Sequence, residues 1–112
     1  MKNANNLSIL IWANKSKADA KGLVPLYARI TLLGKRAEIS TNLKVHAEKW
    51  NPKIGFLNGN GLDSKRTNSE IINIVNAITK AYDDLKRMNE FITADKIKSA
   101  YHGEEKQPRK LI

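Results

Sequence analysis

Apolar and polar residues alternate along the first half of the chain in patterns typical of β-strands. Residues 7–13 (LSILIWA) and 26–32 (LYARITL) are rich in β-branched and aromatic residues, and each run is followed by residues typical of turns. Residues 36–43 come after a tight turn, and their apolar positions recur at every second residue. We therefore predict a ribbon of two or three antiparallel strands.

The predicted second and third strands have one apolar face and one polar face. Because side chains on a strand point alternately to opposite sides, an apolar residue at every second position marks the face toward the core. The inward positions are Leu26, Ala28, Ile30, Leu32, Ala37, Ile39 and Thr41. The outward positions are Tyr27, Arg29, Thr31, Arg36, Glu38, Ser40 and Asn42. The first strand has no polar face, so its pattern does not assign Trp12 to either side.

The turn between these two strands leaves two registers open. A turn over residues 33–34 requires a positive φ at a leucine, which leucine disfavours, and a turn over residues 34–35 avoids this strain. Either turn keeps the same side chains inward and outward. Arg29 lies opposite Ser40 in one register and opposite Glu38 in the other, where Glu38 would neutralise it.

Apolar periodicity in the second half of the chain predicts a long helix. Over residues 64–89, apolar side chains recur every three or four positions and form a stripe, which we expect to pack on the apolar sheet face. The stripe consists of Ile71, Ile74, Val75, Ile78, Ala81, Tyr82, Leu85 and Met88. Thr67 and Glu70 have the spacing of a capping box, and Asp63 or Ser64 is the alternative cap of an earlier turn.

A shorter helix is predicted over residues 93–102. Thr93 is a typical N-cap residue, and Gly103 is a typical stop signal. Residues 104–112 have no apolar periodicity and are interpreted as a linker. The expected architecture is α+β, an antiparallel sheet packed against a long helix with a second short helix.

The connecting segments are less regular. Residues 14–25 are polar and basic and contain a glycine, so we expect a flexible hairpin loop. Residues 45–55 predict a short helical turn closed by Asn-Pro, in which Trp50 is interpreted as a core anchor rather than a base-stacking platform. The glycine-rich residues 55–61 lack the pattern and the strand-to-helix context of a phosphate-binding loop.

The charge balance is the clearest signal in the composition. The chain has 112 residues, with 20 Lys and Arg against 11 Asp and Glu, and a net charge of +9. Residues 1–61 hold 10 basic and 3 acidic side chains and residues 62–112 hold 10 and 8, so the excess belongs to the half that contains the predicted strands. A nucleic-acid partner explains this excess, and a basic surface kept for solubility is the alternative.

Length and composition also limit the class of protein. The chain has the length of one domain. Because it contains no cysteine, disulfides, thiolate metal sites and cysteine nucleophiles are excluded. The apolar run at residues 7–13 is too short to cross a membrane and is not followed by a signal-peptide cleavage site. We therefore expect a soluble, cytoplasmic protein without a membrane partner.

No catalytic or cofactor site is expected in this chain. His46 and His102 lie in different predicted elements and lack the spacing of metal ligands. Asp83 and Asp84 are interpreted as surface charges of the long helix rather than as a catalytic pair. No serine has the surroundings of an activated nucleophile. We predict no enzyme, metal site, cofactor or small-molecule substrate.

A binding surface is the better hypothesis. An antiparallel ribbon fits the major groove of duplex DNA, where polar side chains meet base edges and flanking lysines meet phosphates. Arg29 and Arg36 are candidates to read guanine, and Asn42 is a candidate to read adenine. The candidate DNA-binding residues are Lys15, Lys17, Lys21, Tyr27, Arg29, Thr31, Lys35, Arg36, Ser40, Asn42 and Lys44. An ordinary solvated sheet face is the alternative, and the charge asymmetry disfavours it.

The order of these features resembles a known family. The succession PLYARITLLGKRAEIST (residues 25–41), the stretch VHAEKWNPKIG (residues 45–55), a long helix and a TADKIK helix are similar to the N-terminal arm-type DNA-binding domain of tyrosine recombinases. These enzymes are the integrases of phages and bacterial conjugative transposons, and the likeness covers residues 7–103. It implies a three-stranded antiparallel sheet that enters the major groove of arm-type sites.

The resemblance places Arg29, Arg36 and Ser40 at the groove. In this family a core-binding domain and a catalytic domain follow, so residues 1–103 are expected to be the arm domain and residues 104–112 the linker to a missing core-binding and catalytic region. The catalytic set of Arg, Lys, H-x-x-R, His and Tyr is not found in this chain. The implied partner is double-stranded DNA, with other integrase subunits as further candidates, in site-specific recombination and DNA integration.

Two functions of other classes stay open. A protein-interaction module would use the amphipathic helix to pair with another subunit. RNA binding would use Tyr27 and Trp12 as stacking platforms.

Overall fold

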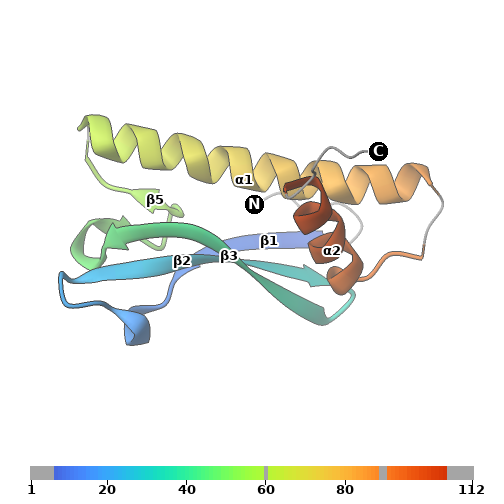
Figure 1. Cartoon of the computed structure of the whole chain (residues 1–112), viewed down its shortest axis with the longest axis horizontal. Coiled ribbons are helices and arrows are strands. Elements are labelled where there is room, and N and C mark those ends of the chain that lie inside the picture. Colours follow the sequence, from blue (N-terminus) through green and yellow to red (C-terminus); the bar gives the residue numbers. More distant parts are fainter. Residues whose placement is uncertain (1–6, 60, 89–90, 106–112) are drawn as a thin grey trace.

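Two layers make up the structure, a β-sheet and a pair of helices that cover one of its faces (Figure 1). The computed structural model describes residues 7–59, 61–88 and 91–105. The sheet is antiparallel, in the order β1-β2-β3, and the architecture is the predicted α+β. Its elements are β1 (Leu7–Ala13), β2 (Leu23–Leu32), β3 (Lys35–His46), α1 (Leu62–Arg87) and α2 (Ala94–Glu105). The connections contain η1 (Lys15–Lys17), η2 (Ala47–Lys49), β4 (Trp50–Asn51) and β5 (Phe56–Leu57).

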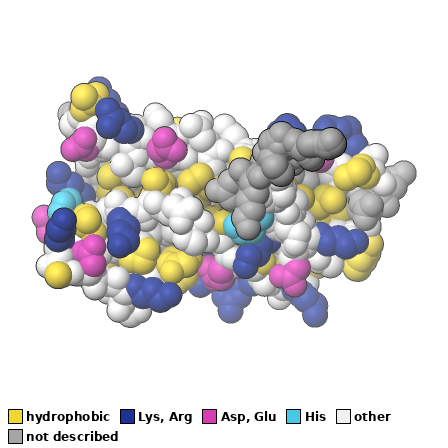
Figure 2. All heavy atoms as spheres, viewed as in Figure 1, with side chains coloured by type: hydrophobic (Ala, Val, Ile, Leu, Met, Phe, Trp, Pro, Cys, Tyr) yellow, Lys and Arg dark blue, Asp and Glu magenta, His cyan; other side chains and the backbone are white. Residues whose placement is uncertain are grey.

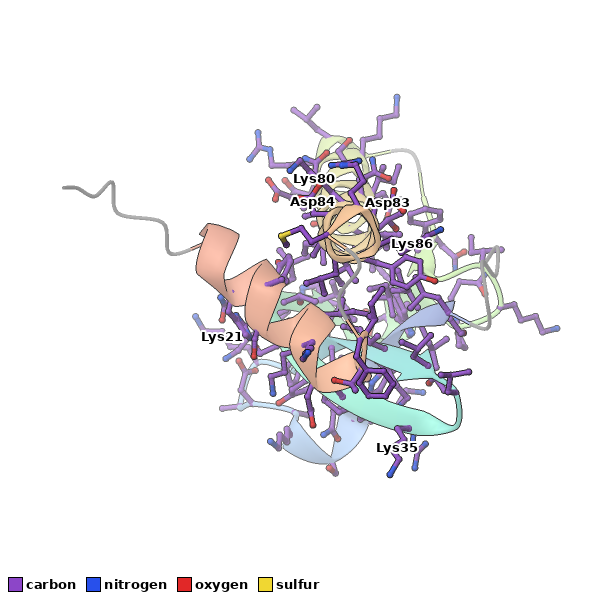
Figure 3. The ribbon with its side chains drawn as sticks, turned by 90° about the vertical axis from the view of Figure 1, so that its right-hand side faces the viewer. Lys21, Lys35, Lys80, Asp83, Asp84 and Lys86 are labelled. Carbon is purple, nitrogen blue, oxygen red and sulfur yellow. The ribbon has the colours of Figure 1, made fainter. Side chains whose placement is uncertain are left out.

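Aliphatic side chains on the inner sheet face form the core. Leu26, Ile30 and Ile39 from this face are all 0% exposed, as are Ile78 of α1 and Ile97 of α2. Helix α2 contacts α1, β2 and β3, and Figure 3 shows it lying against both the long helix and the sheet. Both helices therefore close the sheet, whereas the sequence pattern assigned this role to the long helix.

The turn between β2 and β3 adopts the register that the leucine disfavours. Leu33 and Gly34 form the two-residue loop with φ values of 52° and 83°, which is characteristic of a type I′ turn. The twist of this turn matches that of antiparallel strands, and this match offsets the strain at the leucine. Arg29 consequently lies opposite Glu38, and the alternative pairing with Ser40 is wrong.

A bulge interrupts the pairing of β2 with β3 further along. The register shifts between Tyr27 and Pro25, so that three residues of β3 lie opposite Leu26. The buried hydroxyl of Thr41 donates a hydrogen bond of 2.8 Å to the Leu26 carbonyl and accepts one of 3.1 Å from the Leu43 N–H. This side chain satisfies backbone groups that the bulge removes from the ladder, and β3 continues past the predicted end at residue 43.

The long helix begins earlier than the capping-box spacing suggested. Its N-cap is Gly61, with no side-chain cap, so neither Thr67 nor the alternatives Asp63 and Ser64 cap the helix. Ser64 is buried, and its hydroxyl donates a hydrogen bond of 3.1 Å to the Asn58 carbonyl. Met88 follows the last helical residue and is 61% exposed, so it does not belong to the buried stripe.

The second helix continues through its expected stop. Gly103 lies inside α2 and lacks the positive φ of a helix-terminating glycine. Thr93 does cap the helix, because its hydroxyl oxygen accepts a hydrogen bond of 3.1 Å from the Lys96 N–H. No helix among the described residues is both long and apolar enough to cross a lipid bilayer.

The two connecting segments have more order than their composition suggested. The loop after β1 contains η1, and β2 begins at Leu23 rather than at residue 26. The Asp19 carboxylate accepts hydrogen bonds from the N–H groups of Lys21 and Leu23, at 2.9 and 3.0 Å, and thereby closes the loop. Trp50 is 7% exposed and pairs with Leu57 in a small β4-β5 hairpin, so its interpretation as a core anchor is confirmed.

Candidate nucleic-acid interface

The sheet face turned away from the helices carries the outward side chains of all three strands. The strand register arranges these side chains in three rows across β1, β2 and β3. The rows are Ser8-Thr31-Arg36, Leu10-Arg29-Glu38 and Trp12-Tyr27-Ser40. We call this surface the outer face. Arg29 and Arg36 both lie on it, as the alternation of polar residues predicted.

A carboxylate joins two side chains at the middle of the outer face. Glu38 Oε2 lies 2.6 Å from Arg29 Nε in an ion pair, and Glu38 Oε1 accepts a hydrogen bond of 3.0 Å from Trp12 Nε1. The Arg29 guanidinium carbon lies 5.0 Å from the centre of the Trp12 ring, in a cation-π contact. The side chains of Arg29 and Glu38 are 28% and 40% exposed, so both remain accessible to a ligand.

Aromatic stacking extends this group toward the first loop. The Trp12 and Tyr27 rings are stacked, with centroids 5.5 Å apart and planes inclined by 29°. Lys17 of η1 donates a hydrogen bond of 3.2 Å to the Tyr27 hydroxyl, and its ammonium lies 5.5 Å from the centre of that ring. A connected group of two cations, two aromatic rings and the Glu38 carboxylate thus runs from η1 to β3.

Basic side chains flank the outer face at both ends of the sheet. Lys15, Lys17 and Lys21 are exposed on the loop after β1, whereas Lys35 and Arg36 are exposed beside the hairpin turn. Figure 1 shows this loop and this turn at opposite ends of the sheet, and Lys35 points away from α1 in Figure 3. In Figure 2, Lys and Arg side chains project along the lower border, which is the sheet side. A long polyanion lying along the sheet would meet positive charge at both ends.

Two of the predicted residues lie beside the β3 bulge. Asn42 is exposed and has a φ of 63°, a conformation that asparagine tolerates better than most residues. Lys44 is exposed, and its ammonium lies 3.7 Å from an Asp19 carboxylate oxygen. The pKa of Asp19 is lowered, chiefly by the hydrogen bond from the Leu23 N–H and to a smaller extent by the Lys21 N–H and the charge of Lys44.

The outward side of α1 has compensated charges. Lys80 Nζ lies 3.0 Å from an Asp84 carboxylate oxygen, and Arg87 pairs with the other oxygen of the same carboxylate. These contacts lower the pKa of Asp84, with the hydrogen bond from Lys80 as the largest cause. Figure 3 places Lys80 and Asp84 on the far side of the molecule from the sheet. Two basic side chains of α1, Lys80 and Arg87, are therefore paired with one carboxylate on the helix side.

The structure brings five of the eleven predicted residues onto one face and adds two that the sequence did not propose as DNA-binding residues. Tyr27, Arg29, Thr31, Arg36 and Ser40 share the outer face. The additions are Trp12, which the sequence left unplaced, and Glu38, which it treated only as a neutralising partner. Ser8 was the available signal for Trp12, because this polar residue marks the even-numbered positions of β1 as the outward ones.

Comparison with protein families gives one match. A family model described as "Arm DNA-binding domain" matches residues 11–98, from the middle of β1 into α2. No curated protein and no solved structure matches the chain.

Proposed function

Because the chain belongs to the Arm DNA-binding domain family, the arm-type DNA-binding domain of phage integrase family recombinases, we propose that its outer face reads duplex DNA in the major groove. The family is a non-catalytic DNA-binding module that serves DNA integration. The observation that carries the proposal is the position of Arg29 and Arg36 on one accessible sheet face, opposite the helices, with basic loops at both ends. Sheet ribbons are narrow enough to enter a major groove.

The proposed roles follow from the side-chain chemistry. Arg29 and Arg36 bond the O6 and N7 atoms of guanine, and Asn42 bonds adenine. The hydroxyls of Tyr27, Thr31 and Ser40 supply weaker contacts to bases or to the backbone. The residues proposed to contact phosphates are Lys15, Lys17, Lys21, Lys35 and Lys44.

The proposed biological setting is site-specific recombination by a larger tyrosine recombinase of a mobile element, such as a phage or a conjugative transposon. Residues 1–103 are the arm domain, and residues 104–112 lead to the core-binding and catalytic region, although residues 106–112 lie outside the described part of the chain. Double-stranded DNA in the cytoplasm is the partner, and other integrase subunits assemble on the same DNA.

A DNA-binding experiment at several salt concentrations tests the reading of bases. The probes are duplexes from both ends of the host element and a scrambled duplex of equal length. Arg36→Ala is expected to cost about 1 to 3 kcal/mol more on the cognate duplex than on the scrambled duplex. Lys17→Ala is expected to weaken both duplexes alike and to reduce the salt slope by about 1.

Lys80→Ala is the matched control, because it also removes one positive charge but from the helix side. It is expected to leave both affinities nearly unchanged. Equal affinity of the unmodified protein for cognate and scrambled DNA would reject base reading by the outer face.

The alternative of an assembly module has less support. Ile71, Ile78, Tyr82 and Leu85 of α1 are buried within the chain, so their apolar surface is already used. A tight dimer in sedimentation that ignores DNA at low salt would favour this alternative. RNA binding by Trp12 and Tyr27 is also less supported, because these rings stack on each other, and competition with single-stranded RNA tests it.

A further inference from the structure

We infer that Glu38 is a positioning residue for sequence discrimination, which fixes Arg29 and Trp12 so that the outer edge of the Arg29 guanidinium is presented to a guanine. The inference rests on the proposed function and adds two residues to it. It explains why an acidic side chain stands at the centre of a surface that is meant for a polyanion.

Both oxygens of Glu38 are engaged, each by a different strand. Oε2 holds Arg29 Nε of β2 at 2.6 Å, and Oε1 holds Trp12 Nε1 of β1 at 3.0 Å. The carboxylate therefore ties the outward side chains of three adjacent strands into one unit. A simple surface ion pair would need only one of these contacts.

The contacts restrict Arg29 from two directions. Glu38 holds the Nε edge of the guanidinium, and the Trp12 ring lies against it, with the Arg29 guanidinium carbon 5.0 Å from the ring centre. The Trp12 ring is itself supported by stacking on Tyr27. A long side chain that would otherwise sample many rotamers is held in place before DNA arrives, which lowers the entropy that binding must remove.

The hydrogen-bond donors of Arg29 that Glu38 does not use match the acceptors of guanine. Among the described residues, the N–H groups of Arg29 Nη1 and Nη2 have no protein partner, because the recorded contacts use only Nε and the face of the group. These two nitrogens form a planar fork that matches the O6 and N7 acceptors of guanine. Because Nε is bound to Glu38, the two Nη groups can point toward DNA in one orientation only. A base without two adjacent acceptors would leave at least one of these donors without a hydrogen bond.

The charge of Glu38 makes the inference testable, because it opposes binding to DNA in general. Removing a negative charge from this surface strengthens the attraction of any phosphate backbone. If Glu38 also positions Arg29, the same substitution loosens the guanidinium and weakens the contact with the correct base. The first effect raises the affinity for both duplexes, whereas the second lowers the affinity for the cognate duplex alone.

The experiment uses Glu38→Gln, with fluorescence anisotropy on the cognate and scrambled duplexes over a range of salt. Affinity for scrambled DNA is expected to rise, and the ratio of cognate to scrambled affinity is expected to fall by about tenfold, the size of one bidentate base contact. Glu48→Gln is the matched control, because Glu48 is exposed on η2 outside this group of contacts. It is expected to raise both affinities slightly and to leave their ratio unchanged.

A double substitution shows whether Glu38 acts through Arg29. In an Arg29→Ala background, Glu38→Gln is expected to cause no further loss of discrimination, because the positioned group is already absent. Trp12→Phe keeps an aromatic ring but removes the N–H donor, so a smaller loss of discrimination, about threefold, is expected. Trp12→Phe also serves as the test if Glu38→Gln does not fold.

The outcomes separate the inference from the proposed function. If Glu38→Gln strengthens binding to both duplexes by the same factor, Glu38 only neutralises Arg29 and the inference is wrong, whereas base reading by Arg36 stands. If the unmodified protein does not distinguish the two duplexes, the proposed function itself fails. Additive losses of discrimination in Arg29→Ala and Glu38→Gln would also overturn the positioning role.

Discussion

The two faces of the same three-stranded sheet are stabilised by different physical effects. On the inner face, Ile30 and Ile39 are 0% exposed and pack against both helices, so burial of apolar area dominates. On the outer face, Glu38 links Arg29 and Trp12 through hydrogen bonds and charge in partly exposed surroundings. Exposed ion pairs contribute little to stability. The inner contacts therefore contribute most of the stability of the sheet, and the outer contacts contribute less.

The largest expected effect is a loss of stability when an apolar side chain is removed from the inner face rather than from the outer face. Ile30→Ala leaves a cavity between the sheet and the helices and is expected to lower the free energy of unfolding by about 2 to 5 kcal/mol. Leu10→Ala is the control, because Leu10 lies in the neighbouring strand on the outer face and is 47% exposed. Its expected cost is below about 1 kcal/mol. Urea denaturation measures both, and similar losses would contradict the contrast between the faces.

The next largest effect on the free energy of unfolding is expected at Thr41, a polar residue on the inner face. Thr41→Val keeps the shape but removes the hydroxyl that serves the Leu26 carbonyl and the Leu43 N–H. Leaving the buried Leu26 carbonyl and the partly buried Leu43 N–H without partners is expected to cost about 1 to 3 kcal/mol. Thr31→Val on the outer face is the matched control and should be close to neutral in the same denaturation experiment. A neutral Thr41→Val would show that the bulge does not depend on this side chain.

The hairpin tip belongs to neither face and is expected to be strained. Leu33 has a φ of 52° and is 64% exposed, and a left-handed conformation is unfavourable for leucine. Leu33→Asn is expected to stabilise the protein by about 1 kcal/mol or less, because asparagine tolerates this conformation. Leu33→Ala should give no such gain in thermal denaturation. An equal gain in both variants would attribute the effect to removal of an exposed leucine instead.

The smallest expected effect concerns pH at the loop beside the outer face. The pKa of Asp19 in the folded protein is lowered from its ordinary value of 3.8, chiefly by the Leu23 N–H. Its contribution to stability is therefore complete above pH 3.8 and is lost as the pH falls through the lowered pKa. The NMR signal of the Leu23 amide should titrate with a midpoint below 3.8 and should not titrate in Asp19→Asn. A midpoint at or above the ordinary value would contradict the hydrogen bond in the loop.

Alternation of residue types was sufficient to predict most of the sheet. Because side chains along a strand alternate, the inward position of Ile39 and the outward position of Arg36 held in either register of the hairpin. The start of α1 and its lack of a side-chain cap were not predictable in this way. Thr67 has the sequence spacing of a cap, but the extra helical turn before it is stabilised by Ser64, which bonds to the preceding loop.

The sequence by itself determined which residues of β2 and β3 face the core, which of them face solvent, and that positive charge gathers on the half with the strands. It did not determine which of two registers pairs Arg29, because both preserve the alternation, and only Ser8 indicated on which side of β1 Trp12 lies. Only the tertiary structure decided that Glu38 accepts hydrogen bonds from both Arg29 and Trp12. That arrangement depends on three strands lying side by side, and contacts across strands are not encoded in the spacing along any one of them.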